Sequence, residues 1–384
     1  MSNDLKNYLR NNLDNSHIAL SNPKRILLGP GPSMADPLVL QALSQPLVGH
    51  LDPEFLRVMG QVQGMLQLVF DTENELTLAV PGTGTAAMET AVASVVEKGR
   101  SILVCVKGYF GNRIAEMAKL YQGDLAVLSK PMGEIFDPDE IKKQLKKKPA
   151  QIVAIIQAET SSGVLQPLKE ISKIVHTQGG ILLVDAVTSL GGVPVGVDKN
   201  EIDICYSCSQ KCLGCPPGIS PITYSSAALE LIQKRKDPIA NWYLDINKLS
   251  KYWGVDHVYH HTASSSLVYG LAESLRIILD EGLNTRYQRH LQNARLLWQG
   301  LEEQGLSLLA SEADRLPTLT TVRIPEGLDD LTIRRQLLNE FNIEIGGGLD
   351  ELNGKIWRIG LMGYSSRSEN ILLLLDAFKK ILNS

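Results

Sequence analysis

The chain has 384 residues, which is long for a single compact core and suits one large domain with a smaller one. Hydrophobic residues make up 44% and charged residues 21%, as in ordinary globular proteins, and the formal net charge is −4. This balance offers no basic excess for nucleic acid, and no apolar run reaches the roughly 18–20 residues of a membrane helix. Because the polar N-terminus lacks a secretion signal, we expect a cytoplasmic protein with neither a membrane nor a nucleic-acid partner.

The first 70 residues predict an arm, a turn and helices. Residues 1–22 are polar and mixed in charge. The run Gly29-Pro30-Gly31-Pro32-Ser33 predicts an extended turn. In residues 37–70 apolar side chains return every three or four positions, which indicates helix.

Strand and helix patterns then alternate as far as residue 224. Several of the short apolar runs are apolar on both faces, as in strands of a covered parallel sheet. The predicted strands are 75–80, 101–106, 124–129, 152–157, 181–186, 203–207 and 219–224. Amphipathic segments between them, such as 86–99 and 167–179, predict helices. This order favours an α/β fold built on a mostly parallel seven-stranded sheet.

The remaining residues predict a smaller sheet covered by helices. Residues 240–265 are turn-rich and aromatic, and residues 267–304 predict one long helix. Further strands are expected at 319–325, 343–348 and 355–361, with helices near 330–341 and at 368–382. We therefore expect a large domain over residues 23–281 and a small C-terminal α/β domain over residues 282–384.

A glycine-rich turn between a predicted strand and a predicted helix is a candidate phosphate site. It contains Thr83, Gly84 and Thr85. Glycine lets the backbone approach a ligand, and the free N–H groups at a helix N-terminus attract an anion. A tight turn with threonine as the helix cap would give the same pattern, so this motif is weak by itself.

Two further residues strengthen the candidate site. Asp185 ends the apolar strand ILLVD, where parallel sheets bind ligands, although it could equally cap the next turn. Lys211 follows another strand among small residues, and a buried lysine loses its proton readily. A lone loop lysine is usually a surface group, so the weight comes from the order of all three features.

That order resembles fold type I pyridoxal-phosphate enzymes, and the chain resembles the class V aminotransferases, within them the alanine–glyoxylate (serine–pyruvate) group. The resemblance covers nearly the whole chain. Its motifs are LLGPGPS at 27–33, PGTGTAAMETA at 81–91, ETSSGVLQPL at 159–168, DAVTSLGG at 185–192, SQKCLGCPPG at 209–218, YHHT at 259–262 and WRIGLMG at 357–363.

The resemblance implies a role for each matching residue around pyridoxal 5′-phosphate. Lys211 would carry the cofactor and move the proton, and Asp185 would pair with the pyridine nitrogen. Val187 and Phe110 would pack on the ring, with Phe110 where close relatives carry tryptophan. Thr160 would lie near the phenolic oxygen. The phosphate would be held by Thr83, Gly84, Thr85 and Gln210.

The resemblance also implies substrate contacts and a homodimer with shared active sites. Arg358 would grip the substrate carboxylate, with Gly31 as a second substrate contact. Because Arg358 lies in an apolar strand, a structural salt bridge is the alternative. Tyr259 and Thr262 would reach the phosphate from the partner subunit, and the arm, residues 1–22, would lie at the dimer interface.

The implied reaction is ping-pong transamination of a small amino acid with a 2-oxo acid through pyridoxamine phosphate. We expect alanine or serine as donor and glyoxylate or pyruvate as acceptor. Aminoethylphosphonate transaminase and kynureninase chemistries are alternatives within class V. Cysteine desulfurase is disfavoured because no cysteine follows Cys215.

Four cysteines imitate a metal site. Cys205, Cys208, Cys212 and Cys215 have the spacing C-x2-C-x3-C-x2-C, which could hold zinc or an iron–sulfur cluster in a non-enzymatic binding module. A cofactor must reach Lys211 between them, so we expect packing roles and no metal. For His260 and His261 the resemblance implies a structural place in a dimer-interface loop.

Overall fold

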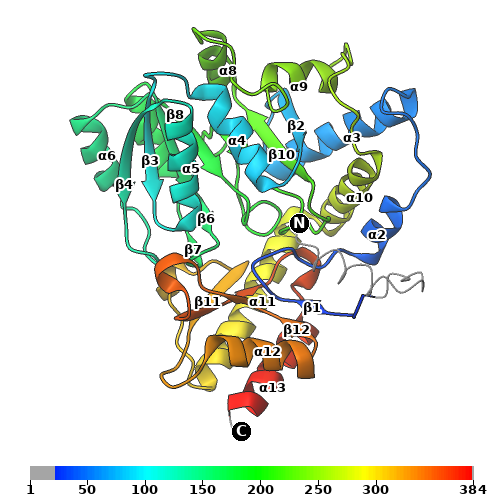
Figure 1. Cartoon of the computed structure of the whole chain (residues 1–384), viewed down its shortest axis with the longest axis vertical. Helices are drawn as coiled ribbons and strands as arrows, with labels where there is room; N and C mark the ends of the chain where they lie inside the picture. Colours follow the sequence, from blue (N-terminus) through cyan, green and yellow to red (C-terminus); the bar gives the residue numbers. More distant parts are fainter. Residues whose placement is uncertain (1–21, 383–384) are drawn as a thin grey trace, which may run out of the picture.

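A seven-stranded sheet forms the centre of the larger part of the molecule (Figure 1). The computed structural model describes residues 22–382. Within them the strand order is β2-β10-β9-β8-β5-β3-β4, and β10 alone runs antiparallel to its two neighbours. All seven predicted strands are in this sheet. Their bounds are β2 Leu76–Pro81, β3 Ser101–Val106, β4 Asp124–Ser129, β5 Ile152–Ile156, β8 Ile181–Asp185, β9 Ile204–Tyr206 and β10 Ile219–Tyr224.

Burial explains why these strands have continuous apolar runs. Every residue of β5 and β8 is buried, so both faces of the sheet are covered at its centre. The helices of this part are α2 Pro37–Leu43, α3 Pro53–Phe70, α4 Gly84–Val95, α5 Tyr109–Leu120, α6 Pro138–Lys147, α7 Lys169–Thr177, α8 Ser226–Gln233, α9 Ile246–Trp253 and α10 Ser265–Glu281. Several begin at an aspartate cap followed by proline, as at Asp52 and Asp137.

A smaller antiparallel sheet forms the second part, at the bottom of Figure 1. Its order is β11-β14-β13, and a separate core containing Leu297, Trp357 and Phe378 packs beneath it. The bounds are β11 Leu319–Arg323, β13 Gly346–Gly347, β14 Ile356–Gly360, α11 Leu283–Glu303, α12 Asp330–Glu340 and α13 Ser368–Leu382. β1 (Ile26–Leu27) pairs with β12 (Ile343–Glu344), so the N-terminal segment joins this part. A short hairpin, β6 Ala158–Glu159 with β7 Val164–Leu165, faces it.

Three sequence predictions require correction. The expected long helix over residues 267–304 is two helices, α10 and α11, divided at Gly282. The helical region over residues 37–70 is likewise interrupted between α2 and α3. The strand expected at 343–348 is two short strands with different partners. Helical periodicity continues on both sides of such breaks, so it does not locate them.

Two expectations are not decided by the fold. The proposed arm falls almost entirely on residues 1–21, outside the described residues. The domain limits at residues 23, 281 and 282 stay a prediction.

Among the described residues, no helix combines the length and apolarity needed to span a bilayer.

We expect Gly282→Ala to destabilise the protein by about 1 kcal/mol, because Gly282 has φ of +79° and a side chain there is strained. A Cβ at this position meets only Thr285 at 3.8 Å, so crowding adds nothing. The matched control is Gly60→Ala on the exposed face of α3, with open space around the new Cβ, which should stabilise by about 0.5–1 kcal/mol. Urea unfolding measures both. If Gly282→Ala and Gly60→Ala changed the free energy of unfolding equally and with the same sign, the backbone conformation of Gly282 would not explain the helix break.

Candidate active site

Nine of the predicted site residues line one cavity of about 190 Å³ at the carboxyl edge of the parallel strands. They are Thr83, Gly84, Thr85, Phe110, Thr160, Asp185, Val187, Gln210 and Lys211. The remaining walls come from Met88, Arg113, Ile156 and Ala158. Segments more than 120 residues apart in the chain are thus brought to one place by the sheet.

One end of the cavity is built to receive an anion. Helix α4 starts there, and its N-cap Thr83 makes no side-chain capping bond, so its hydroxyl stays available. Gly84 packs closely, since a Cβ on it would lie 3.2 Å from that of Cys208. Gln210 has a buried Oε1 atom that has no hydrogen-bond partner among residues 22–382. Arg113, which the sequence analysis did not select, donates to Thr85 Oγ1 at 3.1 Å and adds positive charge.

Asp185 also lines the cavity, and both of its carboxylate oxygens accept hydrogen bonds. Oδ1 accepts the N–H of Val187 at 2.8 Å, and Oδ2 accepts the hydroxyl of Tyr206 at 2.7 Å. Burial nevertheless raises the pKa of Asp185 to about 7. A cation placed beside it would favour the ionised form. Tyr206 was not predicted, because it reads as one more buried strand residue of β9.

Lys211 reaches the cavity beside the N-terminal glycine turn. Its Nζ donates to the carbonyl of Pro30, and a Cβ on Gly31 would overlap the lysine side chain. Gly31 therefore leaves the space that the amine occupies. Loss of hydration on burial lowers the pKa of Lys211, and the nearby charge of Arg358 adds to this. The neutral amine, which is the nucleophile and base, is favoured.

Arg358 lies at the edge of this site and lacks a carboxylate partner among the described residues. It is 7% exposed; Nε donates to the Gly347 carbonyl at 2.6 Å and Nη1 to that of Thr160 at 3.4 Å. Desolvation lowers the pKa of Arg358 to about 10, although Glu159 opposes the shift. The structural salt bridge considered from the sequence is not formed within residues 22–382. A ligand carboxylate would supply the missing charge.

A fully buried lysine, Lys107, was not selected from the sequence. Lys107 is fully buried at the end of β3, and its Nζ donates to Gln166 Oε1 at 3.3 Å. Glu159, on the β6–β7 hairpin, accepts both the N–H and the hydroxyl of Ser161 through Oε1, while its Oε2 has no partner. Burial lowers the pKa of Lys107 and raises that of Glu159. The strand-end position that marked Asp185 would also have marked Lys107.

Tyr259 and Thr262 do not line the cavity of their own chain. Tyr259 is 59% exposed, and its ring lies 5.3 Å from that of His50. In the same loop, His260 stacks on Trp242 and its Nδ1 lies 2.8 Å from Nδ1 of His261. The two histidines therefore contact aromatic rings and each other.

The cysteines pack in separate places. Cys208 lies against Gly84, Cys212 against Gly192 and Cys215 against Gly270, while Cys205 is in the core of β9. All are unpaired and buried. In the described part of the chain no three His, Cys, Asp or Glu side chains are grouped so as to hold a metal ion.

The chain is similar to known aminotransferases over nearly its whole length. The family model "Aminotransferase class-V" matches residues 27–369. The alanine–glyoxylate aminotransferase of Rattus norvegicus is 41% identical over 367 residues, covering 94% of this chain and 89% of that protein. The (S)-ureidoglycine–glyoxylate transaminase of Bacillus subtilis is 37% identical over 381 residues, covering 94% and 92%. A solved alanine–glyoxylate aminotransferase from Nostoc sp. superposes with a TM-score of 0.93 at 53% identity, covering 94% and 96%.

We expect the ligand-free protein to lose stability as the pH rises from about 4 to about 7 through Asp185. The unfolded aspartate titrates near 3.8 and the folded one near 7, so between these values only the folded state keeps the proton. The contribution of Asp185 to the free energy of unfolding is therefore fully present below about pH 4 and lost above about pH 7. The change is about 4 kcal/mol.

Asp185→Asn should remove this part of the pH dependence. Urea unfolding across pH 4–8 measures it, with the exposed Asp237→Asn as the control that keeps the wild-type slope. If the free energy of unfolding depended on pH in the same way in wild type and Asp185→Asn, burial would not shift the pKa of Asp185.

Proposed function

Because the chain belongs to the class V aminotransferase family, we propose that it transfers the amino group of alanine to glyoxylate, with serine as a further donor and pyruvate as a further acceptor. Family membership makes the chain an aminotransferase with pyridoxal 5′-phosphate as its cofactor and a fold type I architecture. The single observation that carries the assignment of its residues is the meeting of Lys211, Asp185 and an anion-binding helix end in one cavity.

The cavity residues fit the cofactor. The partnerless Gln210 Oε1 marks an amide free to turn toward a phosphate, beside the uncapped start of α4 and the Thr83 hydroxyl. Asp185 suits a protonated pyridine nitrogen, which would hold it ionised despite burial. Phe110 and Val187 supply apolar surface for the ring, and Thr160 a hydroxyl for its polar edge. We assign these residues as the cofactor contacts.

Each catalytic group then has one task. When bound, pyridoxal phosphate supplies the carbonyl that accepts the amino group and the ring that delocalises the electron pair left at Cα. Lys211 Nζ, whose pKa is lowered by burial, takes the proton from Cα of the substrate. Arg358 binds the substrate carboxylate and so fixes the direction of the Cα–H bond. Because Gly31 has no side chain, it leaves room for the Lys211 side chain between the cofactor and the substrate.

Two donors deserve comparison because relatives of different names match similarly. The mammalian and Nostoc relatives are named for alanine and glyoxylate, and the Bacillus subtilis relative for (S)-ureidoglycine and glyoxylate. All three names contain glyoxylate, which supports this acceptor most strongly. Alanine is our preferred donor because Met88, Ile156 and Ala158 give the cavity apolar walls.

We further propose a homodimer in which Tyr259 and Thr262 complete the phosphate site of the partner subunit. The loop that carries them exposes Val255 (94%) and Tyr259 (59%), and Trp242, which stacks on His260 of this loop from the segment before α9, is 63% exposed. An apolar surface of this kind favours association with a second chain. Neither Tyr259 nor Thr262 reaches the cavity of its own chain, which also supports a contribution across the interface.

We also propose that the protein works in the cytoplasm. All five cysteines are unpaired, and burial raises the pKa of four of these thiols to about 12 or close to it. Thiols kept reduced in this number are typical of a reducing compartment.

A matrix of donors and acceptors tests the proposed substrates. We expect kcat/KM to be highest for alanine with glyoxylate, lower with pyruvate as acceptor, and at least tenfold lower with 2-oxoglutarate. (S)-ureidoglycine as the best donor would replace alanine in the proposal, and 2-oxoglutarate as an equal or better acceptor would refute it.

Lys211→Ala should lose both the activity and the visible absorbance of the lysine-bound cofactor.

In the same assay, Arg358→Ala should lower kcat/KM for alanine by about 2–4 kcal/mol, roughly 30- to 1,000-fold, because a buried carboxylate loses its charged partner. The visible absorbance of the cofactor should remain. Loss of that absorbance would mean that Arg358 supports the fold instead of binding substrate.

Mixing two inactive variants tests the shared sites. Lys211→Ala lacks the amine, and the double variant Tyr259→Ala/Thr262→Ala lacks the residues proposed to cross the interface. A hybrid dimer would contain one intact site, so random exchange of subunits should restore roughly a quarter of the wild-type activity. Activity is measured after mild denaturation and joint refolding, with each variant refolded alone as the control. No recovery in verified hybrids would place Tyr259 and Thr262 in their own subunit's chemistry.

A further inference from the structure

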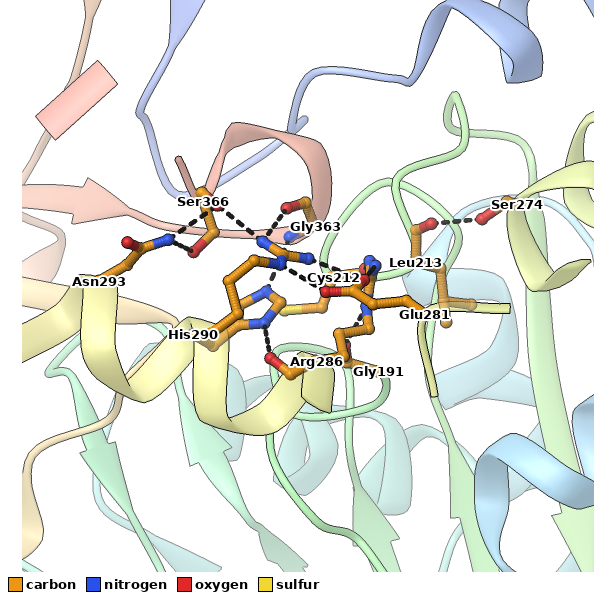
Figure 2. A network of polar contacts seen from close by, with 11 residues as sticks. Gly191, Cys212, Leu213, Ser274, Glu281, Arg286, His290, Asn293, Gly363 and Ser366 are labelled. Atoms are coloured by element: carbon orange, nitrogen blue, oxygen red, sulfur yellow. Dashed lines mark hydrogen bonds and ion pairs between the residues drawn. The ribbon is translucent and has the colours of Figure 1, made fainter. Parts of the chain in front are cut away.

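A network of charged and polar side chains lies at the break between α10 and α11 (Figure 2). We call Glu281, Arg286, Arg289, His290 and Asn293 the joint cluster. All five come from the end of α10 or the first turns of α11. None was selected from the sequence, and none lines the cavity that holds Lys211.

Arg286 connects the segments that carry the two central site residues. It is 4% exposed; its Nε donates to the Gly191 carbonyl at 2.8 Å and its Nη2 to the Cys212 carbonyl at 2.8 Å. Gly191 belongs to the turns that follow Asp185, and Cys212 is the residue after Lys211. One planar guanidinium therefore fixes both backbones relative to each other.

Arg289, His290 and Asn293 bind the segment that follows Arg358. Arg289 Nη1 donates to the Ser366 carbonyl at 2.6 Å, and Asn293 Nδ2 donates to the same carbonyl at 2.9 Å. His290 Nε2 accepts the N–H of Gly363 at 3.1 Å, while Nδ1 donates to the Arg286 carbonyl at 2.8 Å. Burial lowers the pKa of His290 to about 3, so the neutral ring that these bonds require persists at ordinary pH.

Glu281 joins the two halves of the cluster. Its Oε2 lies 2.6 Å from Arg286 Nη1, and its Oε1 lies 2.5 Å from Arg289 Nε. Although burial opposes it, contact with Arg289 and Arg286 lowers the pKa of Glu281 to about 2. The carboxylate is thus ionised and holds both guanidinium groups in fixed orientations.

Polar contacts add to close backbone packing in setting the spacing between these segments. A cavity of about 490 Å³ adjoins the cluster and is lined by Leu213, Ser274, Glu281, Arg286, Arg289 and Gly363, among others. Gly363 approaches the Lys211 segment directly, since a Cβ on it would lie 2.9 Å from the Cys212 carbonyl. With open space on one side, the directional bonds of the cluster must hold these backbones in register.

We propose that the joint cluster is a positioning device that sets the distance between the amine of Lys211 and the guanidinium of Arg358. Arg286 acts on the Lys211 and Asp185 segments, whereas Arg289, His290 and Asn293 act on the segment after Arg358. Glu281 couples the two actions. This inference rests on the proposed roles of Lys211 and Arg358, and it predicts that the two halves of the cluster affect different kinetic constants.

Variants in each half of the joint cluster test whether the two halves affect different kinetic constants. Arg286→Met, and the milder Arg286→Lys, should lower kcat about tenfold or more and weaken cofactor retention, with KM for the amino acid little changed. Arg289→Met should raise KM for both the amino acid and the oxo acid about tenfold and leave the visible absorbance of the cofactor unaltered. Arg276→Met, which removes an exposed arginine of α10, is the matched control and should leave all constants at wild-type values.

Hydrogen–deuterium exchange supplies a reading that needs no activity. In Arg286 variants the amides of residues 186–192 and 209–215 should exchange faster, and in Arg289→Met those of residues 361–367. Loss of thermal stability in both variants with parallel changes in kcat, KM and exchange would overturn the proposal, because a merely structural cluster behaves that way. If wild type fails as an alanine–glyoxylate transaminase but the exchange pattern divides as described, the substrate proposal is wrong and the positioning role holds.

Discussion

A buried carboxyl group and a half-buried amine line one cavity, and their partial removal from water governs the active site. Burial raises the pKa of Asp185 and lowers that of Lys211, so each group favours its neutral form without a charged partner. Tyr206 and the N–H of Val187 support the carboxylate only in part. A cationic ring nitrogen would restore its charge, while the amine remains a nucleophile. The cavity thus suits a cofactor that carries a cationic ring nitrogen beside Asp185 and an anionic group at the start of α4.

The sheet could be predicted in detail because its signal is local. The seven predicted apolar runs are the seven strands of the sheet, and Asp185 was selected from its strand-end position together with the glycine-rich turn and Lys211. Contacts across the sheet could not be predicted in this way. Tyr206 became a partner of Asp185 only through the parallel pairing of β8 and β9. The break at Gly282 was missed because helical periodicity continues on both sides of it.

The cysteines show how a local pattern can have a second physical explanation. Their spacing fits a metal site, yet three of them face glycines on three different segments. Cys208 lies against Gly84 at the start of α4, where a larger side chain would move the anion-binding turn. Cys212 is pressed between Gly192 and the carbonyl of Thr188, to which its thiol donates at 3.3 Å. Small side chains here let the Asp185, Lys211 and Thr83 segments approach closely.

The distance between Lys211 and Arg358 also limits what the site can select. Amine and carboxylate are attached to the same carbon in every 2-amino acid, so a fixed spacing of the two groups recognises the class and not the individual member. Within residues 22–382, Arg358 donates to carbonyl oxygens at Gly347 and Thr160 and pairs with no carboxylate, so its charge is available for the substrate carboxylate that we propose it binds. Discrimination among side chains must then come from walls such as Met88, Ile156 and Ala158. A change of donor should therefore require new wall residues, while the backbone register of Lys211 and Arg358 stays as it is.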